Sequence, residues 1–120
     1  MIEITPIPSS GVLVVRPSGP LSDNDIAGLS AALADAVAET TEVKGLLIDA
    51  AAFPGYEDFA AFAAHIDMVR RYHSRIAKIA FVSDAAFASA AEMFAKTVLG
   101  VEARHFSADD RDRALAWLED

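Results

Sequence analysis

Residues 76–84 read IAKIAFVSD, and this stretch decides the fold. Every position from 76 to 82 is apolar except Lys78, so both faces of the strand that it would form are suited to burial. Residues 43–50, VKGLLIDA, contain a second apolar run of similar length. A long helical segment that begins near Tyr56 separates the two runs. Two buried strands joined through a helix are typical of a parallel sheet with crossover connections, so the sequence predicts an α/β fold.

The start of the chain predicts a hairpin. Ile2 and Ile4 alternate with polar residues, as in a half-exposed strand, and the two prolines that follow restrict this strand to the edge of a sheet. Residues 12–15 are apolar throughout, and the Ser-Ser-Gly turn at 9–11 can return the chain antiparallel to the first strand. We therefore expect one antiparallel edge strand.

Helical segments alternate with the remaining strands. Ser22 and Asp25 have the spacing of a capping box, and apolar residues then recur at helical spacing as far as Thr40. A third helix ends at Gly100, an edge strand covers residues 101–106, and a final helix follows. The predicted order is β-β-α-β-α-β-α-β-α, which gives a mainly parallel five-stranded sheet with one antiparallel edge strand.

The composition limits the class of protein. A chain of 120 residues suits one domain spanning 1–120, and its hydrophobic fraction of 53% reflects many alanines, because the longest apolar runs are only strand-sized and no transmembrane segment is expected. The absence of cysteine excludes disulfides, thiol nucleophiles and thiolate metal sites. A formal charge of -8 repels a phosphate backbone, so nucleic acid is not an expected partner. No export signal follows Met1, and a cytoplasmic location is expected.

Several stretches, taken in order, resemble one bacterial family: 45–49 (GLLID), 53–56 (FPGY), 73–84 (HSRIAKIAFVSD), and 103–106 (ARHF) leading into 114–118 (ALAWL). In their order and spacing they are similar to the SpoIIAA-like family. The resemblance implies a STAS-like β-α superhelix with its helices chiefly on one face of the sheet, related also to Sec14-type lipid-binding domains. It also implies a domain that is not an enzyme.

The chain departs from the family pattern at two places. Anti-anti-sigma relatives carry a phosphorylatable serine where the strand ending at Asp49 meets the next helix, whereas alanines occupy residues 50–52 here. The resemblance therefore implies a module without the phosphoserine switch. Relatives also tend to place tryptophans around the second helix, where this chain has Tyr56, Phe59 and Phe62.

The polar residues do not form a recognisable catalytic pattern. Asp49 and Asp84 follow parallel strands, where carboxylates commonly cap helices and form turns. The three histidines are scattered without the i, i+4 spacing of a zinc pair. Ser83 and Ser107 lie in predicted turns or caps and lack a nucleophile-elbow pattern. We therefore expect no catalytic residues, metal site or cofactor.

The helix that begins near Tyr56 has two apolar faces. At 100° per residue one face is larger, and we expect it to form the core stripe: Phe59, Phe62, Ala63, Ile66 and Val69. A second, weaker apolar face consists of Ala61, Ala64, Met68 and Tyr72. Three interpretations of this second face remain open: a neighbouring helix covers it, it lines a ligand cavity, or it forms a homodimer contact.

Two further clusters suggest binding. Arg70, Arg71, Arg75 and Lys78 form the one basic concentration, which indicates either ordinary charges at a helix C-terminus or an anion patch for a phosphate or lipid headgroup. Six aromatic residues lie on elements that could surround a slot for a hydrophobic small molecule: Phe53, Tyr56, Phe59, Phe62, Phe87 and Phe94.

The sequence thus supports two hypotheses of different class. The first is a STAS-type regulatory module that binds a protein partner or a second copy of itself. The second is a carrier or sensor of a hydrophobic, lipid-like ligand. A surface patch without a deep cavity favours the first, and an enclosed apolar pocket favours the second.

Overall fold

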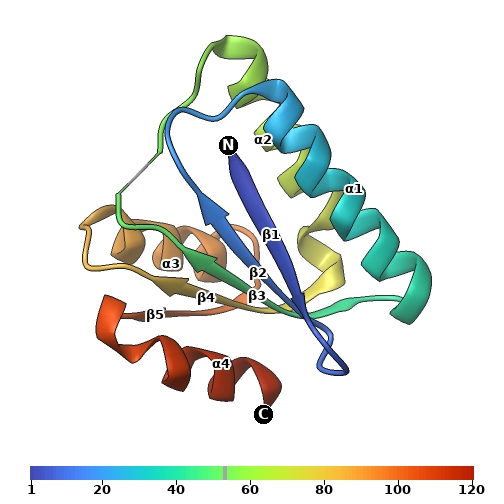
Figure 1. Cartoon of the computed structure of the whole chain (residues 1–120), viewed down its shortest axis with the longest axis vertical. Helices are drawn as coiled ribbons and strands as arrows, with labels where there is room; N and C mark the ends of the chain where they lie inside the picture. The colour runs from blue at the N-terminus through green and yellow to red at the C-terminus, as the bar shows by residue number, and fades with distance from the viewer. Residues whose placement is uncertain (53) are drawn as a thin grey trace.

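The computed structural model describes residues 1–52 and 54–120. After an initial pair of strands, helices and strands alternate along the chain (Figure 1). The elements, in chain order, are β1 Ile2–Ile7, β2 Val12–Pro17, α1 Asp23–Thr40, β3 Val43–Asp49, α2 Phe59–Tyr72, β4 Ile76–Val82, α3 Phe87–Thr97, β5 Glu102–Phe106 and α4 Arg111–Glu119. Short 3₁₀ turns precede β4 and α4. Within these described residues, the helices are too short or too polar to cross a lipid bilayer.

The five strands form one sheet in the order β1-β2-β3-β4-β5, so each strand pairs with its neighbour in the sequence. β1 is antiparallel to β2, with Ile4 opposite Val15. The other pairs are parallel, and Leu47 of β3 lies opposite Ala80 of β4. The predicted α/β fold, with its single antiparallel edge, is confirmed.

The sheet separates two hydrophobic cores. Leu46 and Ile79 face a larger core that also contains side chains of α1, α2 and α3. Their neighbours Leu47 and Ala80 point to the opposite face, where they meet Leu118 of α4. In Figure 1, α4 lies on the other side of the sheet from α1 and α2. The helices therefore cover chiefly one face, as the family resemblance implied.

A glycine allows the close approach of α4 to the sheet. A Cβ atom added to Gly45 of β3 would lie 2.9 Å from the Cβ atom of Leu118, which is closer than carbon atoms normally pack. Leu118 is fully buried. The small residue at position 45 thus sets the distance between the second core layer and its covering helix.

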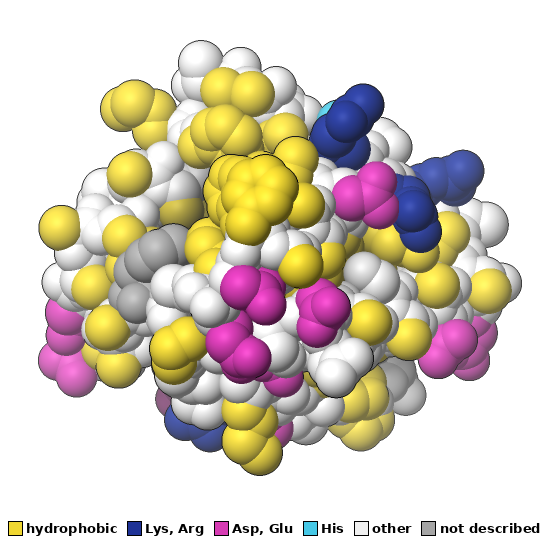
Figure 2. Space-filling model, turned by 90° about the horizontal axis from the view of Figure 1, so that it is seen from above, with side chains coloured by type: hydrophobic (Ala, Val, Ile, Leu, Met, Phe, Trp, Pro, Cys, Tyr) yellow, Lys and Arg dark blue, Asp and Glu magenta, His cyan; other side chains and the backbone are white. Residues whose placement is uncertain are grey.

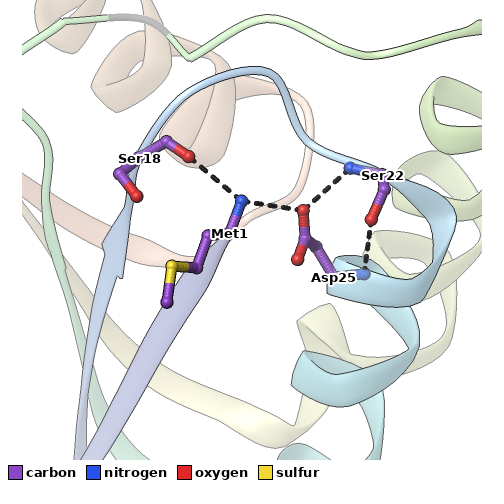
Figure 3. A network of polar contacts seen from close by, with 4 residues as sticks. All are labelled: Met1, Ser18, Ser22 and Asp25. Atoms are coloured by element: carbon purple, nitrogen blue, oxygen red, sulfur yellow. Dashed lines mark hydrogen bonds and ion pairs between the residues drawn. The ribbon is translucent and has the colours of Figure 1, made fainter.

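The start of α1 is fixed by the predicted capping box (Figure 3). The Asp25 amide donates to Ser22 Oγ at 3.1 Å, and the Ser22 amide donates back to Asp25 Oδ2 at 2.9 Å. The amino group of Met1 donates to the same carboxylate oxygen at 2.9 Å and to the Ser18 carbonyl at 3.0 Å. The Ser22 amide, followed by the Met1 amino group, lowers the pKa of Asp25. This network ties β1, the end of β2 and α1 together.

Candidate functional site

Helix α2 is oriented with its smaller apolar face inward. Ala61 is 0% exposed and Met68 is 7% exposed, and Ala64 and Tyr72 pack against the same core. This side of α2 packs mainly on α1. The predicted ligand-wall or homodimer face of Ala61, Ala64, Met68 and Tyr72 is therefore wrong, because a neighbouring helix and the core cover it. The small side chains of Ala61 and Ala64 let the two helices approach closely.

The larger apolar face of α2 points to solvent. Phe59 is 77% exposed, Phe62 41% and Ile66 42%, at i, i+3 and i+7 along the helix. Ala63 is also exposed and Val69 is half-buried. The predicted core stripe was thus assigned to the wrong side of the helix. We call Phe59, Phe62 and Ile66 the α2 stripe.

Aromatic contacts hold the α2 stripe to the loop before the helix. The rings of Tyr56 and Phe62 meet edge to face at 5.3 Å between centroids, and the rings of Phe59 and Phe62 lie 6.0 Å apart. The Tyr56 hydroxyl and Nδ1 of His65 are joined by a hydrogen bond of 2.7 Å. Tyr56 also forms a parallel bridge with Leu21, next to α1. These contacts give the stripe a fixed shape.

Burial changes the acid–base behaviour of the Tyr56–His65 pair. It lowers the pKa of His65, because the imidazolium form would lose hydration. It raises the pKa of Tyr56 for the same reason, since the phenolate is the charged form. Both groups are therefore neutral near pH 7, and the hydrogen bond joins two uncharged side chains.

Charged residues lie at both ends of the stripe. Glu57 is exposed just before α2, and Arg70 is exposed near its end. Arg71 pairs with Asp67 at 2.9 Å on the neighbouring flank. Figure 2 shows hydrophobic side chains gathered at the centre of the face seen from above, with acidic side chains along one flank and basic side chains towards another. The face is thus apolar in the middle and oppositely charged at its margins.

The six aromatic residues predicted to surround a slot are only partly brought together. Phe53 lies outside the described residues. Tyr56, Phe59 and Phe62 form the ring cluster given above, whereas Phe94 is 49% exposed on α3. Phe87, at the start of α3, is half-buried. Exposure of Phe59 and Phe94 means that these two rings do not enclose a slot in this conformation.

Among the described residues, two open pockets are lined by other side chains. One, of about 550 Å³, lies between the β1–β2 hairpin and α1. The other, of about 330 Å³, lies at the ends of β2 and β3, with Arg16 and Asp49 in its lining. Asp49 Oδ2 pairs with Arg16 at 3.4 Å and with Arg111 at 3.3 Å, so Asp49 links β2 to the start of α4 and does not cap a helix. Asp58, not Asp49, caps α2.

The predicted basic patch is divided between two sides of the sheet. Arg75 donates to the Thr41 carbonyl at 3.2 Å. Lys78 donates to the Trp117 carbonyl of α4 at 3.0 Å and lies over the Trp117 ring. Because α4 and α2 cover opposite faces of the sheet, Lys78 does not join Arg70 and Arg71 in one anion patch. The prediction that all four cations form a single patch is therefore wrong.

Polar groups at the ends of β4 and β5 make structural contacts. Ser83 is 2% exposed and its Oγ accepts from the Ala85 amide at 3.0 Å, as expected of a turn residue. Asp84 accepts from the Ala108 amide at 2.9 Å, which joins two loops. His105 Nε2 lies 2.6 Å from the Ser83 carbonyl, and its Nδ1 lies 3.4 Å from the Ser89 hydroxyl. The Ser89–His105 contact had not been predicted, because sixteen positions separate the two residues.

The family of the chain follows from its similarity to known proteins. The family model described as SpoIIAA-like matches residues 12–119, which is nearly the whole chain. The chain belongs to the SpoIIAA-like family. Among curated proteins there is no match.

Solved structures share the SpoIIAA-like fold. An uncharacterised protein with a SpoIIAA-like fold from Shewanella loihica PV-4 is 18% identical, with a TM-score of 0.74, covering 98% of this chain and 92% of that one. The Bacillus cell fate determinant SpoIIAA in its phosphorylated form is 11% identical, with a TM-score of 0.57, covering 96% and 99%. At these identities the likeness establishes the fold alone.

Proposed function

We propose that this SpoIIAA-like domain is a non-enzymatic binding and regulatory module that recognises a protein surface through the α2 stripe. The exposure of Phe59, Phe62 and Ile66 on a helix whose other side is fixed in the core carries the proposal. Full burial of such a side chain is worth about 1.5–3 kcal/mol, so a partner that covers the stripe gains a favourable contribution from each. Aromatic residues are also enriched at the centres of protein interfaces.

The fixed shape of the stripe supports this function. Phe62 is held by the Tyr56 ring, and Tyr56 is held in turn by His65 and Leu21. A surface that is already ordered loses less conformational entropy on binding than a mobile one. The α2 stripe is therefore better suited to recognition than isolated exposed side chains would be.

The polar residues support a non-enzymatic role. Ser83 is buried in a turn, Asp84 joins two loops, and Asp49 is paired with two arginines. His105 contacts a backbone carbonyl through Nε2 rather than a carboxylate. A hydrolytic site needs a nucleophile, an oriented base and donors for the developing oxyanion, and the described contacts of these residues are those of turns and loop connections.

Regulation by a phosphoserine in the turn after β3 is not part of this proposal. Alanines occupy residues 50–52, and Ala50 is buried. If the domain is regulated, control comes instead through occupancy of the binding face. Incubation with an anti-sigma kinase and mass spectrometry would test this, and stoichiometric phosphate on Ser83 would contradict it.

A hydrophobic small molecule is the second candidate ligand. The observation that favours it is the ring cluster of Tyr56, Phe59 and Phe62, over which an apolar molecule could spread. Native mass spectrometry of freshly purified protein would report such a molecule as added mass that is lost on denaturation. Retained lipid that protects Phe59 from solvent would favour the carrier function over protein recognition.

A photo-crosslinker placed on the stripe tests the main proposal. Benzoylphenylalanine at position 59 retains an aromatic ring at a site that is 77% exposed. The matched control carries the same group at Glu39, which is exposed on α1. Irradiation in growing cells is expected to give a discrete protein adduct from position 59 but not from position 39.

Adducts at both positions, or at neither, would overturn the proposal. Mass spectrometry of the adduct then shows whether the captured protein is a different protein or a second copy of this chain. An Ile66→Asp change in the position-59 protein should abolish the adduct, because it places a carboxylate in the centre of the contact.

A further inference from the structure

The exposed side of α2 is complementary to a second, antiparallel copy of the same helix. At 100° per residue, Phe59, Ala63, Ile66 and Arg70 lie along nearly one line of the helix surface. Each of the four is exposed. The line begins beside an acid, Glu57, and ends with a cation, Arg70, so two such helices placed antiparallel bring opposite charges together at both ends.

We propose that a second copy of this chain occupies the α2 stripe, with the two α2 helices antiparallel about a two-fold axis. This inference rests on the proposed function and specifies its partner. A two-fold contact requires only one self-complementary patch on each copy. The charges at the two ends and the side-chain sizes along the line meet that requirement.

The register follows from the side-chain sizes. A two-fold axis level with the peptide between residues 64 and 65 places Ile66 of one copy opposite Ala63 of the other, twice. Each branched side chain then faces a small one, which is how helices pack closely. The same register sets Phe59 of one copy opposite Arg70 of the other, an arrangement in which a guanidinium can lie over an aromatic ring.

The ends and flanks fit this register. Glu57 is exposed and lies two residues before Phe59, just outside the helix, so this register places it at the same end of the contact as Arg70 of the other copy. The two-fold axis also puts the Phe62 side chains of both copies on the same flank. Asp67 and Arg71 satisfy each other within one copy at 2.9 Å and stay at the other flank.

Charge and size set the strength of the contact. Each copy carries a formal charge of -8, which opposes association at long range, and one helix from each copy buries a small area. The dimer is therefore expected to be weak, and detection requires concentrations up to about 1 mM at near-physiological salt. Sedimentation velocity over such a series should show the mass rising from 12.7 kDa towards twice that value.

Charge-reversal variants test whether Glu57 and Arg70 pair between the two copies. Glu57→Lys and Arg70→Glu each create like-charged pairs at both ends, and each is expected to weaken association about tenfold or more. A one-to-one mixture of these two variants should associate again, because at one end the introduced lysine meets the introduced glutamate, and at the other end the unchanged Arg70 meets the unchanged Glu57. The variant that carries both changes should recover in part, because the charges at both ends are again opposite although the contact of Arg70 with Phe59 is lost, and its formal charge returns to -8, the value of the wild type.

The outcomes separate this inference from the proposed function. Circular dichroism must show that all variants are folded, which is expected at exposed positions, and Glu39→Lys on α1 controls for net charge. A monomeric wild type at the highest concentration, or a double variant and mixture that stay monomeric, overturns the two-fold contact. If position 59 meanwhile crosslinks to a different protein, the binding function stands and only the identity of the occupant is refuted.

Discussion

Truncation of Met68 to alanine should destabilise the domain more than truncation of Phe59, although phenylalanine is the larger residue. Met68 is 7% exposed within the core beneath α2, and Met68→Ala removes most of a buried side chain. The expected loss is about 2–5 kcal/mol in the free energy of unfolding, from lost transfer energy and from the cavity that remains. Phe59 is 77% exposed, so Phe59→Ala should change stability by no more than about 0.5 kcal/mol.

Phe62 gives an intermediate point on the same scale. It is 41% exposed, and since full burial of a phenylalanine contributes about 1.5–3 kcal/mol, Phe62→Ala should cost about 1–2 kcal/mol. A core position would instead cost about 3–5 kcal/mol. The three variants together therefore measure the rotation of α2 about its axis.

Urea unfolding followed by circular dichroism provides the assay. With a slope of about 1–2 kcal/mol/M for a chain of this size, Met68→Ala should lower the midpoint by about 1–5 M at unchanged slope. Low protein concentration keeps any self-association from adding to the apparent stability. A larger loss for Phe59→Ala than for Met68→Ala would show that α2 is rotated by half a turn and would refute the exposed stripe.

Three other changes test separate parts of the fold. Gly45→Ala should cost about 1–3 kcal/mol in urea unfolding, because the new methyl would lie 2.9 Å from Leu118; a neutral change would mean that α4 can shift freely. Ser22→Ala should cost about 0.5–2 kcal/mol in urea unfolding, because the Asp25 amide loses its side-chain acceptor; the pKa of Asp25 should stay low in an NMR titration, since the amide of residue 22 and the Met1 amino group still donate to its carboxylate. Burial lowers the pKa of His65 in the folded chain, so as the pH falls the unfolded chain protonates this histidine at a higher pH than the folded chain does. The free energy of unfolding should therefore fall as the pH drops below about 6.5. His65→Gln should make the free energy of unfolding less dependent on pH below about 6.5. An unchanged dependence would show that His65 is not its cause.

The strands and most helix ends could be predicted from local patterns. Residues 76–82 are apolar on both pleat faces, and they form β4 between two other strands. Ser22 and Asp25 marked the start of α1 because a capping box is a contact between near neighbours in the chain. α2 begins at Phe59, three residues after the predicted start near Tyr56. Tyr56 forms a bridge with Leu21 and the Glu57 amide donates to the Leu21 carbonyl, so these residues pair with the segment before α1 instead of forming a helical turn.

The rotation of α2 could not be predicted because the helix is apolar on both sides. Hydropathy favours the face with the larger residues, Phe59 and Phe62, as the core. Close packing on α1 instead requires the small residues, and Ala61 is 0% exposed there. The choice depends on the distance between α1 and α2, which is a tertiary property.

Contacts between distant positions were also beyond local patterns. Arg111 reaches Asp49 across 62 positions, and Tyr56 finds its hydrogen-bond partner in a side chain further along α2. A sequence indicates which residues can pair but not which pairs the topology brings together. Lys78 shows the converse, because it is close to the α2 cations in sequence but its side chain lies on the opposite side of the sheet.

The strand order β1-β2-β3-β4-β5 has a consequence for synthesis of the chain. Each new strand can add to the edge of a sheet that has already emerged from the ribosome, without inserting between earlier strands. The apolar face formed by Val14, Leu47 and Ala80, however, is covered by α4, which is made after all five strands. Until Leu118 has emerged, the nascent sheet presents this face to solvent, and a chaperone that binds apolar surfaces should associate with ribosome-bound chains stalled before α4 and release those that extend beyond it.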